Sequence, residues 1–156
     1  DAPVTKVGEM AFCECTNLKS ISLPNSVTEL GGWAFFCCLY LEEIVLSSRL
    51  KVIGDAAFSS CSELKDITLP DSVTTIGDSA FYGCSGMWGY FGKYASEDNR
   101  CLVVDNVLRH FAPKGLDEYQ IPNGITTIAV ILNLALPLNR TLLSQSCKRD
   151  KCKECK

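Results

Sequence analysis

Apolar and polar positions along the first part of the chain recur with a 23-residue period. Each unit contains a segment Leu-x-x-Ile-x-Leu, at residues 18–23, 41–46 and 64–69, in which apolar residues alternate over a short span. This alternation is typical of a half-buried β-strand, and Pro24 or Pro70 then ends the strand because proline cannot donate a hydrogen bond to a neighbouring strand. The strictest columns of the period are Gly8, Gly31, Gly54 and Gly77; Ala11, Ala34, Ala57 and Ala80; Phe12, Phe35, Phe58 and Phe81; and Cys15, Cys38, Cys61 and Cys84.

Two further segments complete each unit. The β-branched segments at 27–30 and 73–76 predict a second short extended piece, and the glycine after each predicts a bend. The segment Ala-Phe-x-x-Cys-x-x-Leu, for example residues 11–18, has the apolar spacing of one or two helical turns with a single buried face. One unit cannot bury its own apolar edge, whereas stacked units can, with strands about 4.8 Å apart. The pattern therefore predicts an α/β repeat solenoid with a parallel strand ladder and short helical turns.

The order of residues within the units resembles a known repeat family. Residues 23–38 read Leu-Pro-Asn-Ser-Val-Thr-Glu-Leu-Gly-Gly-Trp-Ala-Phe-Phe-Cys-Cys, and residues 69–84 read Leu-Pro-Asp-Ser-Val-Thr-Thr-Ile-Gly-Asp-Ser-Ala-Phe-Tyr-Gly-Cys. Both resemble the 23-residue, BspA-like branch of the leucine-rich repeat family, over residues 3–87 and again at 121–128. The chain lacks the asparagine of the ladder found in plain leucine-rich repeats.

The resemblance implies a right-handed leucine-rich-repeat coil. Proteins of this kind are typically surface or secreted proteins of bacteria, and of some protozoan parasites, that adhere to host or neighbouring-cell proteins. The resemblance brings no catalytic residue and no cofactor with it.

The period also predicts how the chain is organised. We expect four 23-residue repeats over residues 1–87, an insertion with a β-hairpin over 88–120, the start of a further repeat over 121–128, and an atypical tail over 129–156.

The insertion is the least repetitive part of the chain before the tail. Residues 101–111 predict the hairpin, because Asp105 and Asn106 suit a tight two-residue turn in which both residues have positive φ. In a symmetrical hairpin around this turn, Cys101 lies opposite His110. A thiol beside an imidazole is the core of cysteine-nucleophile catalysis, but nothing nearby supplies an orienting group or an oxyanion hole. We therefore predict no catalytic residue and no enzymatic activity.

Two surfaces are candidate binding sites. Rigid aromatic side chains on loops are common anchors of protein interfaces, although an elaboration of the repeat without a ligand also explains the insertion. The concave strand face is the second candidate because solenoids bind along extended surfaces, although its mixed side chains also suit a solvated face. The candidate residues are Trp88, Tyr90, Phe91 and Tyr94 in the insertion, and Lys19, Ser22, Glu43, Val45, Asp66 and Thr68 on the strand face.

Charge and hydropathy exclude several classes of partner. The net charge of −3 over 156 residues argues against a nucleic-acid ligand. The charge is uneven, because residues 1–128 carry −7 and residues 129–156 carry +4. No stretch approaches the roughly 18 apolar residues of a membrane-spanning helix, so we expect no membrane insertion. The first residues show no signal peptide and no starting methionine, which predicts a fragment or a processed chain.

The ten cysteines suggest a disulfide scaffold or metal sites at first. The period instead assigns four of them to one repeated column, which we expect to be buried and reduced, because buried cysteine packs as a small apolar residue. The three cysteines after residue 146 are one fewer than the four ligands of a structural zinc site. We therefore predict neither a metal nor any other cofactor.

The tail breaks the period after Ile128, where the repeat requires glycine, then Ala-Phe, and then cysteine at position 136. Two explanations remain open. The tail is either an atypical capping segment, which terminal repeats need, or an out-of-frame translation that begins near residue 129. In the second case the nucleotide sequence restores the repeat in a shifted frame.

The function that these observations predict is a non-enzymatic protein-interaction and adhesion module. The family resemblance implies an extracellular or cell-surface location and a protein partner, such as a host matrix or cell-surface protein. The alternative is a structural spacer repeat in a larger surface protein, with no ligand of its own.

Overall fold

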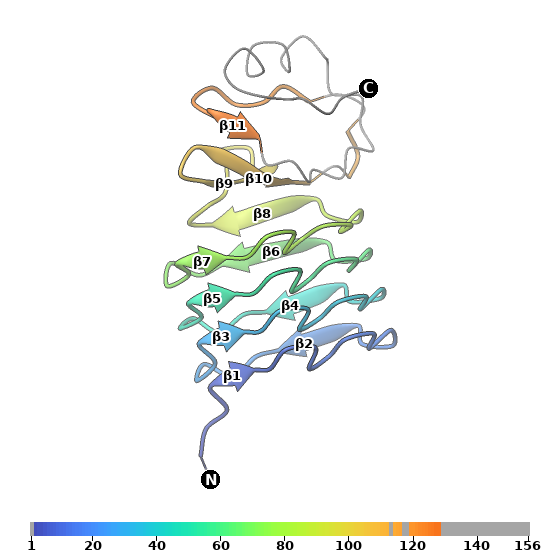
Figure 1. The fold of residues 1–156 in the computed structure, drawn as a ribbon. Helices are drawn as coiled ribbons and strands as arrows, with labels where there is room; N and C mark the ends of the chain where they lie inside the picture. Colours follow the sequence, from blue (N-terminus) through green and yellow to red (C-terminus); the bar gives the residue numbers. More distant parts are fainter. Residues whose placement is uncertain (1, 113, 117–118, 129–156) are drawn as a thin grey trace, which may run out of the picture.

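The computed structural model describes residues 2–112, 114–116 and 119–128, which form a stack of turns that begins at the N-terminus (Figure 1). Each of the first four turns contributes two strands, so two rows of strands run along the stack. The first row consists of β1 (Lys6–Val7), β3 (Glu29–Leu30), β5 (Val52–Ile53) and β7 (Thr75–Ile76). The second row consists of β2 (Ser20–Ser22), β4 (Glu43–Val45), β6 (Asp66–Leu69) and β8 (Gly89–Gly92).

The strands pair in parallel, with the 23-residue register of the sequence. In the first row Val7 pairs with Leu30, Leu30 with Ile53, and Ile53 with Ile76. In the second row β2 pairs with β4, and β6 pairs with β8. The predicted solenoid of parallel strands is therefore confirmed.

The segments that connect the two rows are tight turns. The described residues contain no helix, so the predicted helical turns, and with them the α/β class, are not confirmed. In the second turn Trp33 (φ 52°) and Cys37 (φ 56°) adopt the left-handed backbone conformation. The N–H of Phe36 donates to the carbonyl of Trp33 (3.1 Å), whereas the N–H of Phe35 donates to the carbonyl of Ala57 in the next turn (2.7 Å).

This backbone is incompatible with an α-helix. A helix requires consecutive right-handed residues and a hydrogen bond from each N–H to the carbonyl four residues earlier. Here alternate N–H groups leave their own turn and bond to the neighbouring one, as in a sheet. The chain is therefore a β-solenoid, and among the described residues no helix is long and apolar enough to cross a membrane.

The core runs through the stack as ladders of identical side chains. The ring of Phe35 stacks between the rings of Phe12 and Phe58, with centroid distances of 5.0 and 5.4 Å. Phe58 stacks in the same way on Phe81, at 5.4 Å. The ladder ends against the insertion, where the ring of His110 meets Phe81 edge-on at 5.3 Å.

The repeated cysteine column lies within this core. Cys38, Cys61 and Cys84 are buried, and each thiol donates a hydrogen bond to a phenylalanine carbonyl of the preceding turn, at 3.0 to 3.1 Å. Cys15, in the first turn, is only partly buried. The predicted burial is therefore confirmed for three of the four cysteines, and the seven cysteines among the described residues are free.

The insertion contains the predicted hairpin. The antiparallel strands β9 (Cys101–Val104) and β10 (Val107–Phe111) are joined by Asp105 (φ 52°) and Asn106 (φ 61°). A bulge between Leu108 and His110 shifts the register by one residue, so that Cys101 pairs with Phe111. The predicted Cys101–His110 pair is therefore wrong, because a symmetrical register allows no bulge.

The last described strand continues the stack beyond the hairpin. β11 (Thr127–Ile128) pairs in parallel with β10, with Thr127 opposite Val107. Residues 129–156, with their three cysteines, lie outside the described residues. The two explanations of the tail therefore stay predictions.

Candidate functional site

The second row of strands, which consists of the pairs β2–β4 and β6–β8 one after the other along the stack, presents an outer surface. Ile44, Ile67 and Tyr90 point inward and are buried. Because side chains alternate along a strand, the residues on either side of them point outward. We call the outward residues of β2, β4, β6 and β8, together with the residue before each of these strands, the strand face.

The strand face brings together the candidate residues predicted from the repeat. Ser22 pairs with Val45, and Thr68 pairs with Phe91, so these four side chains follow one column across the strands. The six strand-face residues named from the sequence are all exposed; they are Lys19, Ser22, Glu43, Val45, Asp66 and Thr68.

The four candidate aromatic residues of the insertion do not share one surface. Trp88 and Phe91 are 51% and 40% exposed and belong to the strand face. Tyr90 is buried, and burial raises the pKa of its hydroxyl well above the usual value. Tyr94 is half-buried, and its hydroxyl donates a hydrogen bond to the carbonyl of Val73 (3.0 Å). Only Trp88 and Phe91 are therefore available to contact a partner.

The sequence contains a signal for the burial of Tyr90. Tyr90 lies one repeat period after Ile67 and therefore occupies the column of inward-pointing isoleucines. The strand that carries it, β8, is paired with β6 in the repeat register, with Ile67 opposite Tyr90. The last strand of the fourth repeat thus lies inside residues 88–120, the predicted insertion.

The side chain of Trp88 is held in place by the insertion. The guanidinium of Arg100 lies over the indole ring at 6.0 Å, which is within the range of a cation–π contact. Arg100 Nη1 also donates to the carbonyl of Lys114 (2.9 Å) and so fixes the loop beside the ring. A Cβ atom on Gly115 would lie 2.9 Å from the indole, which shows how closely the backbone covers that side. Trp88 is therefore both exposed and ordered.

The charged residues of the strand face have mixed signs. Lys65 Nζ lies 2.5 Å from Glu42 Oε2, and this contact raises the pKa of Lys65 and lowers that of Glu42. Glu43 and Asp66 form no ion pair with another described residue. Both residues occupy one outward column, so a carboxylate lies two residues before Val45 on β4 and two residues before Thr68 on β6.

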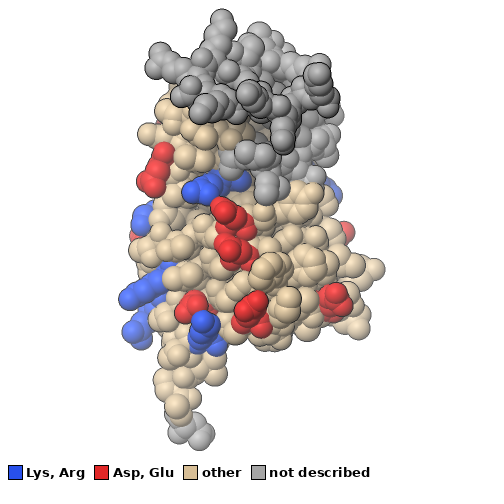
Figure 2. Space-filling model, viewed as in Figure 1, with Lys and Arg blue, Asp and Glu red and all other residues tan. Residues whose placement is uncertain are grey.

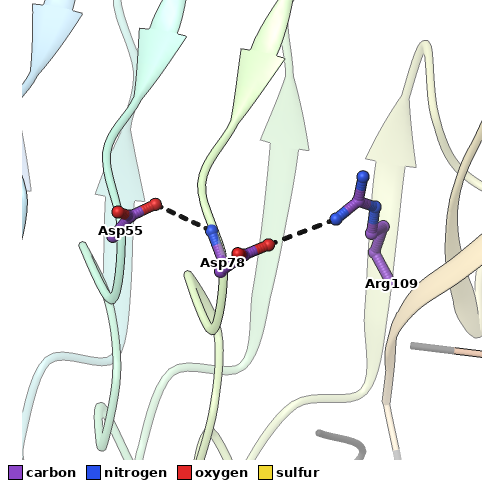
Figure 3. A network of polar contacts seen from close by, with 3 residues as sticks. All are labelled: Asp55, Asp78 and Arg109. Carbon is purple, nitrogen blue, oxygen red and sulfur yellow. Dashed lines mark hydrogen bonds and ion pairs between the residues drawn. The ribbon is translucent and has the colours of Figure 1, made fainter. Parts of the chain in front are cut away.

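A separate polar network lies over the first row of strands. The side chain of Asp55 accepts a hydrogen bond from the backbone N–H of Asp78 (2.9 Å), and Arg109 Nη1 lies 3.3 Å from Asp78 Oδ1 (Figure 3). Arg109 is the residue at the hairpin bulge, so this contact joins the insertion to the repeats. Figure 2 shows acidic and basic side chains interspersed on this side, with uncharged areas between them.

Cys101 and His110 are not arranged for nucleophilic chemistry. The Cys101 thiol lies 3.3 Å from the hydroxyl of Tyr119, which donates to Asp98 (2.6 Å). Burial raises the pKa of Cys101, so the reactive thiolate is disfavoured. The imidazole of His110 is buried against Phe81, and burial lowers its pKa to about 4. These groups stabilise the insertion and do not form a nucleophile–base pair.

An open cavity of about 610 Å³ lies between the insertion and the segment that leads to β11. Its two carboxylates are those of Glu97 and Asp98, and Asp98 already accepts hydrogen bonds from Ser96 and Tyr119. Within the described part of the chain, no group of three or more His, Cys, Asp or Glu residues could hold a metal ion. The cavity therefore offers no assembled acid–base or metal-binding set.

Comparison with known proteins agrees with the repeat architecture. The family model described as "BspA type Leucine rich repeat region (6 copies)" matches residues 1–87. None of the curated proteins compared with the chain matches it.

Several solved structures are similar to the chain. A leucine-rich repeat protein from Bacteroides capillosus is 38% identical, with a TM-score of 0.54 over 58% of this chain and 64% of the other. The pneumococcal vaccine antigen PcpA is 26% identical, with a TM-score of 0.66 over 81% of this chain and 33% of the other. A leucine-rich repeat protein from Eubacterium ventriosum, 22% identical with a TM-score of 0.50 over 82% of this chain and 42% of the other, shares the fold. The chain spans less than two thirds of the length of each of these proteins.

Proposed function

Because the chain belongs to the BspA-type leucine-rich repeat family, we propose that it is a non-enzymatic adhesion module that binds a protein partner across the strand face. One observation carries this proposal, namely that Val45 and Phe91 are 51% and 40% exposed in the outward column of the strands, and that Trp88, directly before β8, is 51% exposed. Large apolar side chains that gather on one exposed surface are typical of protein-interaction sites. The polar residues around them suit the rim of such an interface.

Binding on this face needs little rearrangement of the module. Trp88 is already held between Arg100 and the loop at Gly115, so it loses little conformational entropy when a partner covers it. The strands beneath are fixed by the parallel pairing of β2 with β4 and of β6 with β8. The carboxylates of Glu43 and Asp66, which form no ion pair with another described residue, would select the orientation of the partner, because charges at a rim contribute more to specificity than to affinity.

The same proposal places the module outside the cell or on its surface. The family supports this location, and one similar structure is described as a pneumococcal vaccine antigen. Labelling of intact cells with an antibody against the folded module tests the location. Signal from intact cells is expected, and signal only after the cells are lysed contradicts it.

The binding proposal is tested with a double variant of the two exposed aromatic residues, Trp88→Ala with Phe91→Ala. Binding to a panel of purified host matrix and cell-surface proteins is measured by biolayer interferometry. An anchor residue contributes about 2 kcal/mol, so the double variant should lose at least about 30-fold in affinity for the partner found in the panel. The matched control is Tyr40→Ala with Tyr82→Ala, which removes two aromatic residues of similar exposure (57% and 42%) outside the strand face.

The two outcomes that contradict the proposal are distinct. Equal affinities for the strand-face variant and the control variant place the binding surface elsewhere. If no member of a broad panel binds the unmodified module, the observation favours the structural spacer, for which a ligand is not needed.

A further inference from the structure

Two cysteines of the first two turns lie outside the repeated cysteine column. They are Cys13 and Cys37, and both are half-buried. In the fourth turn the position of Cys13 is occupied by Tyr82, which is 42% exposed. In the first turn the position of Cys37 is occupied by Glu14, which is also exposed. Both thiols therefore belong to the outer side of the turns and not to the packed core.

The backbone holds these two cysteines side by side. The N–H of Glu14 donates to the carbonyl of Phe36 at 2.7 Å, so the segment that contains Cys13 lies directly against the segment that contains Cys37. In the repeat register Cys13 lies opposite Phe36, and Cys37 is the next residue. With neighbouring strands about 4.8 Å apart and consecutive Cα atoms about 3.8 Å apart, the Cα atoms of the two cysteines are about 6 Å apart. The Cα atoms of a disulfide are usually about 4.4 to 6.8 Å apart, so the backbone already has the required spacing.

The two thiols also influence each other's ionisation. The pKa of Cys13 is raised by burial, then by the charge of Glu14, and then by the thiols of Cys37 and Cys15. The influence of Cys37 shows that its thiol lies near that of Cys13, because the repulsion between two thiolates weakens with distance. A disulfide carries no charge, so its formation removes this repulsion.

We propose that Cys13 and Cys37 form a reversible disulfide that links the first turn to the second. The oxidant is a small disulfide such as glutathione disulfide, which reacts by thiol–disulfide exchange. The thiolate of one cysteine attacks the small disulfide and releases one glutathione, and the second cysteine then attacks the mixed disulfide and releases the other. Two protein thiols are oxidised, one small disulfide is reduced, and the two thiol protons pass to the two glutathione molecules.

The other two thiols at this place are less suited to the link. The thiol of Cys38 is buried and donates a hydrogen bond to the carbonyl of Phe12 at 3.0 Å. Burial raises the pKa of Cys38 to about 11, so little of the reactive thiolate forms. Cys15 belongs to the repeated column and packs against the core, so its side chain does not point to the outer side where Cys13 lies. The geometry therefore selects one pair among the four cysteines.

The disulfide would close a loop that contains the 23 residues between the two cysteines. A cross-link of this kind restricts the unfolded chain, so oxidation should stabilise the folded protein. The location outside the cell that we propose above provides an oxidising environment in which disulfides persist. The link itself requires neither that location nor a partner on the strand face, because it depends only on the contact between the first two turns.

The experiment equilibrates the reduced full chain with a mixture of oxidised and reduced glutathione. The remaining thiols are blocked with iodoacetamide, and the protein is cleaved after glutamate without reduction. Cleavage after Glu14 separates Cys13 from Cys15, so mass spectrometry of the linked peptides identifies which cysteine takes part. The variants are Cys13→Ser and Cys37→Ser. The matched control is Cys15→Ser, which removes a half-buried thiol of the same turn.

The native chain and the control should both yield residues 10–14 linked to residues 30–42, with fragmentation placing the bond at Cys37 and not at Cys38. Oxidation should raise their thermal unfolding midpoint by about 5 °C or more. Both effects should be lost in Cys13→Ser and in Cys37→Ser. A native chain that forms no bond at Cys13, or that links Cys13 to a cysteine other than Cys37, overturns the proposal. A midpoint that rises equally in Cys13→Ser also contradicts it, because another bond is then responsible.

Discussion

The buried imidazole of His110 should make the stability of the solenoid depend on pH in a defined window. His110 is 6% exposed and lies edge-on against Phe81, where burial, with a smaller contribution from Arg109, lowers its pKa from 6.5 to about 4. The folded protein therefore favours the neutral imidazole. Below pH 6.5 the unfolded chain binds a proton that the folded chain resists, so stability falls as the pH decreases towards about 4.

The size of this effect follows from the shift. One pKa unit corresponds to about 1.4 kcal/mol of free energy of unfolding, so the gap between 6.5 and about 4 corresponds to about 3 kcal/mol. The contribution of His110 is complete above pH 6.5 and is lost below about pH 4. The carboxylates with lowered pKa values, Asp98 and Glu42, titrate below their usual values of 3.8 and 4.5 and therefore act mainly at lower pH.

The assay is urea unfolding at a series of pH values between 4 and 7, for the native chain and for His110→Phe. The variant keeps an aromatic ring at the end of the phenylalanine ladder but cannot bind a proton. Because the other groups titrate equally in both proteins, the difference between their free energies of unfolding isolates His110. It should change by about 3 kcal/mol between pH 7 and pH 4. A difference that does not vary with pH would refute the assignment of a depressed pKa to this group.

Three further predictions concern the stacking of the turns. Gly77→Ala should destabilise the chain by about 3 kcal/mol, because the new Cβ would lie 2.5 Å from a backbone carbon of the neighbouring turn. Gly8→Ala is the matched control, with no atom within 4 Å of its new Cβ, and a thermal melt should show almost no change. Phe58→Ala should cost about 3–5 kcal/mol in a denaturant titration, and Phe12→Ala clearly less, because Phe12 is only partly buried; equal losses would contradict the ladder. Arg109→Ala should cost at most about 1 kcal/mol, and the loss should vanish at high salt because the ion pair to an exposed carboxylate is screened.

The strands were predictable because each carries an apolar residue at a fixed position of the period. Ile44 and Ile67 point inward as the alternation requires, and both sit in the register that the repeat specifies. The hairpin turn was predictable for a similar reason, since Asp105 and Asn106 tolerate the positive φ that they adopt. The strands and the hairpin turn were therefore predicted correctly from the alternation of apolar residues, the 23-residue period and the preferred residues of a tight turn.

The connecting turns could not be distinguished from helices by the same means. Their apolar spacing suits either structure, and the residues with positive φ include Trp33 and Ala56, whose side chains give no signal for a left-handed backbone. Their conformation is set by hydrogen bonds to the next turn of the stack, which is distant in the sequence, as from Phe35 to Ala57. The bulge at Arg109 was not predictable either, because the turn residues Asp105 and Asn106 fix the turn and carry no signal for a register shift three residues later.

The candidate site was predicted in part. The strand face followed from the alternation, but the sequence alone could not show that the insertion holds Trp88 in place, because Arg100 and Gly115 approach the ring only in three dimensions. Tyr90 was assigned to the insertion although the period places it in the core. The fourth repeat therefore extends beyond residue 87 and includes β8, although residues 88–92 lack the Ile-x-Leu pattern of the earlier strands.

The constant sequence separation between neighbouring turns also sets the length of the loop that the chain closes when each turn forms. The thiol of Cys38 bonds to a carbonyl 26 residues away, and the hydroxyl of Ser26 to one 22 residues away, and neither separation depends on how many turns the protein has. The entropy lost in closing a loop rises with its length, so each added turn closes a loop of the same size as the one before it. Relative contact order therefore falls as turns are added, although contacts between strands usually raise it and slow folding. A protein of this kind can grow in length without making its slowest loop closure any harder.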